Sequence, residues 1–480
     1  MVTTDNRKSD ALALGVYESV ADAIGNTPLV RLNSVTEGVA ATVYVKLEYL
    51  NPGGSVKDRA ALSMIRAAEA SGDLRPGGTV VEGTSGNTGV GLAMIAASRG
   101  YRTVVVVPDK TSVEKIALLR AHGAEVRVTP GGRPSHHPEF VRNVAARLAQ
   151  EIPGGWLAGQ YDNPANPAAH RTTTGPEIWN QTSGRISHLV AGIGTGGTLS
   201  GAGGYLKEVS GGTVSVIGAD PKHSVYGGGD GRAWYVEAVG HFLHPQTEED
   251  DWPDSYHPEI VDQIEQITDV EAISTLHRLA REEGLLLGGS SGVAVAAALR
   301  AARNLGKDDI VVVIAPDSGR AYLSKYFDDD WLGPLGFPLY HKTSGATVRD
   351  TLQNRYRPFD YVPSSASLAA ARELIGNRDS LPVALERSAS GSVPIAEILG
   401  IVSAAGLSGS RDTEPVTAHV EPPLPTIGLT EPTSAAARRL SGHTGYVVVA
   451  DAGTAVGLAD VSDFTGPVTL TTPGRLFINP

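Results

Sequence analysis

The sequence contains no cysteine among its 480 residues. Disulfide bonds, thiolate metal sites and cysteine nucleophiles are therefore excluded. The chain also has fewer basic than acidic residues: it contains 40 lysines and arginines and 52 aspartates and glutamates, which gives a formal net charge of -12. A chain without a basic surplus has little charge with which to neutralise phosphates, so we expect no nucleic acid as its main partner.

Long apolar runs are missing as well. No stretch approaches the roughly 18 residues that a membrane-spanning helix needs, and the polar opening MVTTDNRKSD lacks the apolar core of a signal peptide. We therefore expect a cytoplasmic protein that does not enter a membrane. Hydrophobic residues make up 41% and charged residues 19%, as in ordinary globular proteins. A chain of this length exceeds one core, which predicts two or three domains.

Short β-branched runs alternate with helical patterns between about residues 43 and 313. The strand-like run TVYVKLEYL is followed by the helical run SVKDRAALSMIRAAEASG, and TVVEG is followed by NTGVGLAMIAASRG. Alternation of this kind indicates an α/β fold in which helices cover both faces of parallel sheets. The acidic run TEEDDWPD near residue 250 interrupts it and predicts a solvated loop.

The composition shifts towards Ser, Ala, Pro and Thr after about residue 341, where we place a domain boundary. Beyond it the chain contains a weak internal repeat, whose halves open with GATVRDTL and TEPVTAHV. Each half offers a short strand, a helix and a pair of strands. A repeated unit of this kind predicts a pseudo-symmetric pair.

The loop GIGTGG, residues 192–197, follows the strand-like run HLVA and opens a helix at Thr198. Its backbone amides would face an anion at the helix N-terminus. With Asp220 at the end of the next strand, the loop also passes as a dinucleotide fingerprint. Taken alone, this loop is compatible with three interpretations: a dinucleotide site, a site for another phosphate ligand, or tight packing without a ligand.

A second polar loop, EGTSGNTG, spans residues 82–89 and also links a strand to a helix. A plain helix cap needs one polar side chain, whereas this loop offers several hydroxyls and an amide. Such a set at a helix N-terminus suits a carboxylate or another anion. The polar residues are Thr84, Ser85, Asn87 and Thr88.

The stretch NPGGSVKDRA places a lysine where a helix begins. Ser55 and Asp58 form a capping-box pattern, so Lys57 would lie in the first turn, where the helix dipole disfavours a positive charge. A lysine that loses its proton readily is the kind that forms Schiff bases. A lysine for an aldehyde, a glycine loop for a phosphate and a polar loop for a carboxylate together describe pyridoxal phosphate. A dinucleotide enzyme has no use for the first and the third.

Seven motifs then resemble the cysteine synthase and cystathionine β-synthase family of fold-type II pyridoxal-phosphate enzymes. The resemblance implies a catalytic domain over residues 1–340, built from two open parallel-sheet subdomains, of which the smaller, residues 52–160, closes over the site. The motifs run in order from about residue 17 to residue 337: IGNTPLVRL, NPGGSVKDR, TSGNTG, NPANP..H..TTGPEIW, GIGTGGT, EEGLLLGGSSG and PDSGR.

The tail, residues 341–480, resembles a degenerate CBS-domain pair, an α+β module that often binds adenosyl compounds. Its second half reads GLADVSD, which keeps Asp463 but has Asp460 at the hydroxyl position of the family motif, and its first half has Gly406 in place of the aspartate. We therefore expect either an adenosyl ligand at this module or a structural and dimerising role.

The resemblance also implies roles for individual residues. Lys57 would form the Schiff base with the cofactor and remove the substrate α-proton, Asn87 would contact the phenolic oxygen, and Ser290 would face the pyridine nitrogen. No metal site is expected. The phosphate would be bound by Gly194, Thr195, Gly196, Gly197 and Thr198, and the substrate carboxylate by Thr84, Ser85, Gly86, Thr88 and Gln160.

The implied activity is β-replacement on an amino acid through an aminoacrylate, with serine and homocysteine giving cystathionine as the first interpretation, and a homodimer by family analogy. A cysteine synthase that uses O-acetylserine or O-phosphoserine with sulfide is the second. The third is β- or γ-replacement with an amine nucleophile, with S-adenosylmethionine as a candidate donor. Arg171, Ala238 and His241 depart from the family pattern and leave the nucleophile open. A ligand-sensing non-enzyme and a dinucleotide oxidoreductase are the rival classes.

Overall fold

The structure is a computed structural model that describes residues 16–84, 86–109, 111–247, 250–341, 344–387 and 392–465. The chain divides into two compact units, Met1–Phe327 and Asp328–Pro480. The sequence places the boundary near residue 341, but the segment before that point packs within the second unit. For example, Thr430 Oγ1 donates to the Phe337 carbonyl at 2.6 Å, and the Gly453 amide donates to the Leu335 carbonyl at 2.7 Å.

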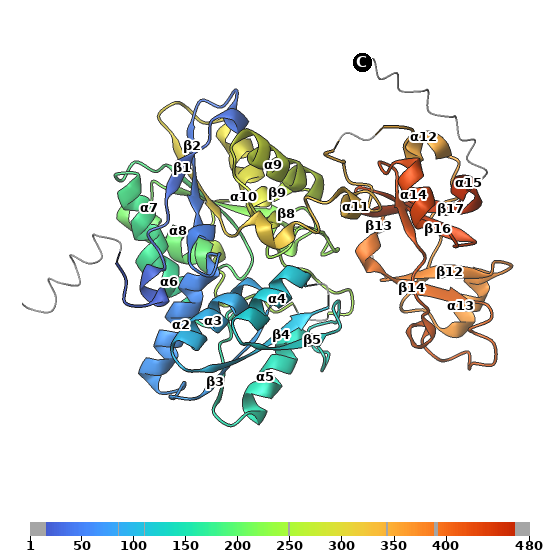
Figure 1. The fold of residues 1–480 in the computed structure, drawn as a ribbon, viewed down its shortest axis with the longest axis horizontal. Coiled ribbons are helices and arrows are strands. Elements are labelled where there is room, and N and C mark those ends of the chain that lie inside the picture. Colours follow the sequence, from blue (N-terminus) through green and yellow to red (C-terminus); the bar gives the residue numbers. More distant parts are fainter. Residues whose placement is uncertain are drawn as a thin grey trace, which may run out of the picture. The chain divides into compact units, whose positions relative to one another are not determined.

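A six-stranded sheet forms the larger part of the first unit (Figure 1). The antiparallel edge strand β1 is followed by five parallel strands. Val312 and Val216 lie in one core cluster with α7 and α8, and the alternating residues Val311, Val313 and Val190 are also buried. Both faces of the sheet are therefore covered, as near-continuous apolar strands require. In sheet order the strands are β1(Leu29–Arg31), β2(Thr42–Leu47), β10(Ile310–Ala315), β7(His188–Gly192), β8(Ser215–Pro221) and β9(Gln263–Ile267). The helices in these parts of the chain are α6(Ala165–Ala169), α7(Gly175–Gln181), α8(Gly197–Val209), α9(Asp269–Glu282) and α10(Gly289–Ala302).

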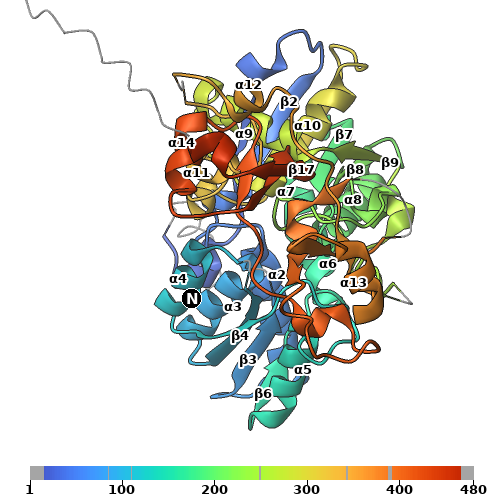
Figure 2. The same ribbon diagram turned by 90° about the vertical axis from the view of Figure 1, so that its right-hand side faces the viewer.

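A four-stranded parallel sheet forms the smaller part of the first unit. Val80 packs with α2 and α3, and Val105 packs with α3 and α4, whereas Val81 and Val104 face α5. Because side chains alternate along a strand, α2, α3 and α4 cover one face and α5 covers the other (Figures 1 and 2). In sheet order the strands are β5(Glu125–Thr129), β4(Arg102–Pro108), β3(Thr79–Gly83) and β6(Gly155–Leu157). The helices are α2(Lys57–Ser71), α3(Asn87–Ser98), α4(Val113–Ala121) and α5(Val141–Glu151).

The second unit repeats one supersecondary unit, in the order that the internal repeat of the sequence predicts. A short strand is followed by a helix and by two strands, and in both halves the short strand pairs parallel to the next strand, which pairs antiparallel to the last. The first half comprises β11(Val362–Pro363), α13(Leu368–Ile375), β12(Ser380–Ala384) and β14(Ile398–Ser403). The second comprises β15(Thr426–Gly428), α14(Thr433–Arg439), β16(Tyr446–Asp451) and β17(Thr454–Asp460). The remaining elements are α11(Asp329–Leu332), α12(Val348–Leu352), β13(Val393–Pro394) and α15(Ser462–Thr465).

Short helical turns connect many of these elements. Along the chain they are η1(Val20–Ala23), η2(Ser34–Thr36), η3(Glu48–Leu50), the π-helical turn η4(His170–Thr174), η5(Val225–Gly227), η6(Pro258–Ile260), η7(Gly319–Tyr322), η8(Ile395–Glu397) and η9(Val416–His419).

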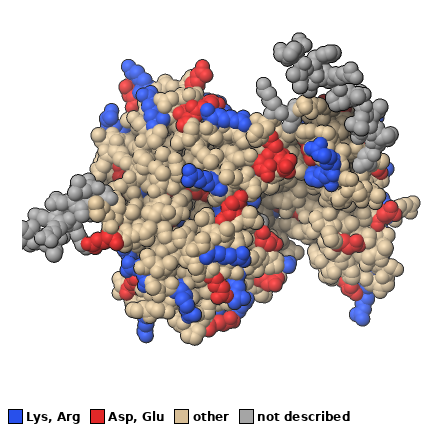
Figure 3. Space-filling model, viewed as in Figure 1, with Lys and Arg blue, Asp and Glu red and all other residues tan. Residues whose placement is uncertain are grey.

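Basic and acidic side chains are interspersed on the face of the chain that Figure 3 shows. In the described parts of the chain, none of the helices is both long and apolar enough to span a bilayer.

Candidate functional site

The polar loop, the glycine loop and Gln160 follow the carboxyl ends of parallel strands, whereas Ser290 lies at the start of α10. The polar loop follows β3, the glycine loop follows β7, and Gln160 follows β6. Ligands of open α/β sheets bind outside these strand ends. Side-chain amides join the loops of the smaller sheet to those of the larger one: Asn87 Nδ2 donates to Asp317 Oδ2 at 2.7 Å, and Asn166 Nδ2 donates to both Gln160 O at 2.8 Å and Thr195 Oγ1 at 3.1 Å.

Lys57 is the first residue of α2, as its sequence context predicts. Ser55 Oγ accepts the Lys57 amide at 3.2 Å. The predicted capping box is nevertheless wrong in both halves: the Asp58 amide donates to the Ser55 carbonyl and not to its hydroxyl, and Asp58 Oδ2 accepts the Gly53 amide at 2.6 Å instead of the Ser55 amide. The turn at Gly54, with φ of 85°, presents the Gly53 amide to that carboxylate, which takes the place of the reciprocal cap.

The electrostatic surroundings of Lys57 favour a neutral amine. Burial lowers the pKa of Lys57 to about 8, and the charge of Glu82 opposes that shift. An amine with this pKa is neutral in about a tenth of molecules at pH 7, far more than an ordinary lysine, and the neutral form is a base and a nucleophile.

The polar loop after β3 brings three of its predicted residues and Gln160 together. Thr84 Oγ1 accepts the Gly86 amide at 3.2 Å, and Thr88 Oγ1 donates to Gln160 Oε1 at 2.5 Å. Gly86 has φ of 135°, and a Cβ there would lie 2.6 Å from Lys115 Cδ, so only glycine fits. Ser85 lies outside the described residues.

The glycine loop is held from three sides. Tyr226 donates its hydroxyl to the Gly194 carbonyl at 2.8 Å, and His170 Nε2 lies 3.2 Å from Thr198 Oγ1, in addition to the Asn166 contact with Thr195. The helix α8 begins at Gly197, after Gly196 with φ of 84°, and no side chain caps it. Its first amides therefore remain available for an anion.

Ser290 is the second residue of α10 and is only 2% exposed. Its hydroxyl has no hydrogen-bond partner among the described residues, and the same holds for the neighbouring Ser291. A buried polar group without a partner costs about 1–3 kcal/mol, and the Ser290 hydroxyl therefore has a hydrogen-bonding capacity that a bound ligand could satisfy. The Gly288 amide at the start of this helix donates to the Asp317 carbonyl at 3.1 Å, and Asp317 Oδ2 accepts both Asn87 Nδ2 at 2.7 Å and the Tyr322 hydroxyl at 2.5 Å.

Four side chains that touch these loops were not singled out by the sequence analysis: Glu82, Asn166, His170 and Asp317. Glu82 opens the polar loop, Asn166 and His170 belong to NPANP..H, and Asp317 belongs to PDSGR. The sequence signal that could have identified these four residues is a polar side chain inside a glycine-rich motif or directly after a strand.

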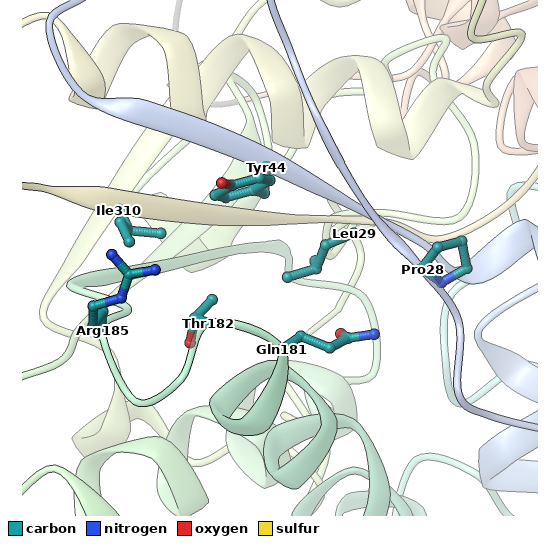
Figure 4. A pocket seen from close by; sticks show the side chains of 7 residues that line it. All are labelled: Pro28, Leu29, Tyr44, Gln181, Thr182, Arg185 and Ile310. Atoms are coloured by element: carbon teal, nitrogen blue, oxygen red, sulfur yellow. The ribbon is translucent and has the colours of Figure 1, made fainter.

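The described residues also line a pocket of about 330 Å³ at the edge strand β1 (Figure 4). None of the predicted site residues lines this pocket. Arg185 and Tyr44 are the only ionisable residues among its lining residues. The lining comprises Pro28, Leu29, Tyr44, Gln181, Thr182, Arg185 and Ile310.

Comparisons with known proteins agree on one family. A family model described as "Pyridoxal-phosphate dependent enzyme" matches residues 20–317. The cystathionine beta-synthase of Apis mellifera is 44% identical over 324 residues, which cover 67% of this chain and 64% of that protein. A probable cysteine synthase of Bacillus subtilis is 45% identical over 315 residues, which cover 65% of this chain and 97% of that protein. The crystal structure of O-ureido-L-serine synthase superimposes with a TM-score of 0.59 at 39% identity, over 66% of this chain and 99% of that one. This chain thus spans less than two thirds of the length of the Apis relative.

These matches contradict the dinucleotide interpretation of GIGTGG. Asp220, the acidic residue of that fingerprint, is fully buried and its Oδ2 accepts the Gly227 amide at 2.8 Å, so it supports the backbone beside the loop. Because the matched model spans more than half of the sequence, this chain belongs to the family of pyridoxal-phosphate dependent enzymes, and its cofactor is pyridoxal phosphate.

Proposed function

We propose that this chain catalyses β-replacement on an amino acid, with serine and homocysteine giving cystathionine as the leading reaction. The observation that carries this choice is the second compact unit, Asp328–Pro480. The Bacillus cysteine synthase is matched over 97% of its length by only 65% of this chain, which leaves that unit without a counterpart there. The Apis cystathionine beta-synthase also extends beyond the shared part, since only 64% of it is matched.

The residues of the site fit pyridoxal phosphate. The unpartnered hydroxyl of Ser290 suits an acceptor nitrogen, the uncapped start of α8 suits a phosphate, and the neutral amine of Lys57 suits an aldehyde. When bound, the cofactor supplies that aldehyde and a ring that accepts electron density from the substrate Cα. A Ser290 hydroxyl at the ring nitrogen would leave that nitrogen uncharged, and such a ring would withdraw electrons only moderately, which would favour loss of the β-group.

The side chains of this site divide the remaining work. Asn87, held by Asp317, would donate its second N–H to the phenolic oxygen, and the amides of α8 with Thr195 and Thr198 would hold the phosphate. Thr84, Thr88 and Gln160 hold the substrate carboxylate. Lys57, once its amine is released, takes the proton from the substrate Cα and returns it before product leaves. The smaller sheet, within residues 52–160, closes over the site and keeps water from competing with the nucleophile.

Gly197→Ala tests the phosphate loop. A Cβ at Gly197 would lie 2.3 Å from Asn166 Oδ1, so the side chain that holds Thr195 must move. We expect the affinity for pyridoxal phosphate to fall by about tenfold or more, because a displaced loop loses charge-assisted hydrogen bonds. Equilibrium dialysis of the cofactor measures the change. Gly306→Ala, where the added Cβ would make only an ordinary contact with Asp309 Oδ2 at 3.7 Å, is the matched control and keeps wild-type affinity.

A different nucleophile is the second candidate function, with two forms. One is sulfide, as in the relatives named cysteine synthase. The other is a non-thiol, by β- or γ-replacement, and the solved O-ureido-L-serine synthase supports it because its named product is an O-linked serine derivative. The residues that depart from the family pattern add weight: Ala238 adopts φ of 65°, and His241 Nε2 lies 2.6 Å from Asp250 Oδ1.

For the second unit we propose a CBS-domain pair with a structural and dimerising role in a homodimer. Asp460 is the ground for preferring that role to an adenosyl ligand. Its Oδ1 accepts the Ser462 amide at 2.9 Å and the Ser462 hydroxyl at 2.7 Å. The Asp460 carboxylate is therefore hydrogen-bonded to the first residue of α15.

The proposed function is tested by absorbance of the cofactor-loaded chain. Serine, O-acetylserine, O-phosphoserine and S-adenosylmethionine are added in turn, and homocysteine, sulfide and amines are then tested for reversing any change. A shift of the visible band with serine that homocysteine reverses supports the leading reaction. If no amino-acid donor moves the band, β-replacement is excluded, and a shift with S-adenosylmethionine alone assigns γ-replacement.

A further inference from the structure

Glu82 is a buried carboxyl group beside Lys57 that the proposed reaction does not use. It lies near the end of β3 and is 2% exposed. Its Oε2 accepts the Gly159 amide at 2.8 Å, but the bond from Gln160 Nε2 to Oε1 is long, at 3.3 Å. The charged or titratable groups that face it are Lys57 from α2, Arg142 from α5 and Tyr161 after β6.

Glu82 starts a chain of hydrogen bonds that runs into the proposed carboxylate site. Gln160 Nε2 donates to Glu82, and Thr88 Oγ1 donates to Gln160 Oε1 at 2.5 Å. Every donor in this chain points towards Glu82. A hydroxyl has a single hydrogen, so a Thr88 that donates to Gln160 has none for a ligand carboxylate. As arranged, the chain is poorly set to bind the anion that it faces.

We propose that Glu82 is a positioning residue that takes up a proton when a carboxylate ligand binds and thereby reverses the donors of this chain. This inference rests on the proposed carboxylate site. The proton comes from solvent and resides on Glu82 Oε1, which then donates to Gln160 Oε1 after the Gln160 amide turns over. Gln160 Nε2 next donates to Thr88 Oγ1, and the Thr88 hydroxyl hydrogen turns to the ligand carboxylate. The Gly159 amide keeps its bond to Oε2 throughout.

Electrostatics act in the same direction as the hydrogen bonds. Burial raises the pKa of Glu82 to about 7, although the amides of Gly159 and Gln160 and the charge of Arg142 oppose the shift. A ligand carboxylate adds a like charge nearby and raises that pKa further. Carboxylate affinity should therefore be highest below about pH 7 and fall as the pH rises through that value and Glu82 loses its proton.

The test is calorimetric binding of 3-hydroxypropanoate to the cofactor-loaded chain. This molecule is serine without the amino group, so nothing in it titrates near neutral pH. Repeating the titration at about pH 7.5 in buffers of different ionisation heat counts the protons exchanged. We expect uptake of about half a proton or more, and an affinity that falls about tenfold from roughly pH 6.5 to 8.5.

Two variants locate the proton. Glu82→Gln, whose amide donates to Gln160 at every pH, should bind as tightly as the wild type or more tightly, with uptake near zero and a flat pH profile. Glu37→Gln, at an exposed position, should keep wild-type uptake. A merely structural role for Glu82 would lower cofactor content and thermal stability without changing the number of protons exchanged.

Three results would overturn the inference: no binding of 3-hydroxypropanoate, binding without proton uptake, or equal uptake by Glu82→Gln. If Glu82→Gln does not fold, the infrared difference spectrum of the wild type decides, because an isotope-labelled ligand must produce a protonated carboxyl band that the label does not shift. Failure of the proposed function is separate, since then no amino acid moves the visible band of the loaded chain.

Discussion

Lys57→Ala is expected to lower turnover by about 10³-fold or more while the chain remains folded. The substitution removes both the amine that receives the cofactor aldehyde and the base that moves the Cα proton, and proton transfer by a positioned side chain alone contributes about 10²–10⁴-fold. Lys57 is well placed for both tasks, because burial lowers its pKa to about 8. The measurement is steady-state turnover with the donor that moves the visible band.

The variant also loses the covalent attachment of the cofactor, which is visible by mass spectrometry after borohydride reduction. Lys307→Ala is the matched control, because Lys307 is exposed in the loop before β10. It should keep wild-type turnover and attachment. Attachment that persists in Lys57→Ala would assign the role to another lysine and remove the basis of the proposed mechanism.

Arg59→Met should reduce the free energy of unfolding by about 3–5 kcal/mol, because it leaves the buried Glu48 without its ion-pair partner and leaves Glu177 with Lys46 alone. Arg59 is almost fully buried on α2 and bonds Glu48 at 2.7 and 2.9 Å and Glu177 at 2.6 and 2.8 Å. Burial alone would raise the pKa of Glu177, but the bonds and charges of Arg59 and Lys46 lower it to about 2. Methionine fills similar space, so loss of charge dominates the change.

Urea unfolding followed by tryptophan fluorescence measures this effect, with the midpoint compared at equal slope. Arg278→Met is the control for removal of one arginine charge. Arg278 pairs with Glu282 at 2.9 Å on the exposed side of α9, where such pairs contribute about 0.3–0.5 kcal/mol. Equal destabilisation by the two substitutions would show that the buried cluster does not hold the start of α2 in place.

The sequence predicted the elements of the site wherever a local motif carries the information. The alternation of strands and helices predicted parallel sheets, because periodicity and glycine punctuation are local properties of the chain. The helix start at Lys57 and the glycine loop before α8 were predicted for the same reason. The family motifs predicted that the cofactor is pyridoxal phosphate, and the family match confirms this prediction.

Contacts between distant parts of the chain were decided by the tertiary structure. The Asn87–Asp317 bond joins residues 230 positions apart, and nothing local to either loop specifies it. The predicted capping box at Ser55 and Asp58 is wrong because the Asp58 carboxylate accepts the Gly53 amide instead. The first compact unit likewise ends at Phe327, because the following segment bonds residues far along the chain, such as Thr430, which is 93 positions from Phe337.

By itself, then, the sequence determined the family and the cofactor, and it predicted which loops carry the chemistry, because those properties lie in short motifs of fixed spacing. Only the tertiary structure decided how the loops are supported. The orientation of Gln160 between Glu82 and Thr88, and the unpartnered hydroxyl of Ser290, arise from burial and from chain segments brought together by two sheets. The cost of burying charge and polar groups without partners depends on surroundings that a motif does not contain.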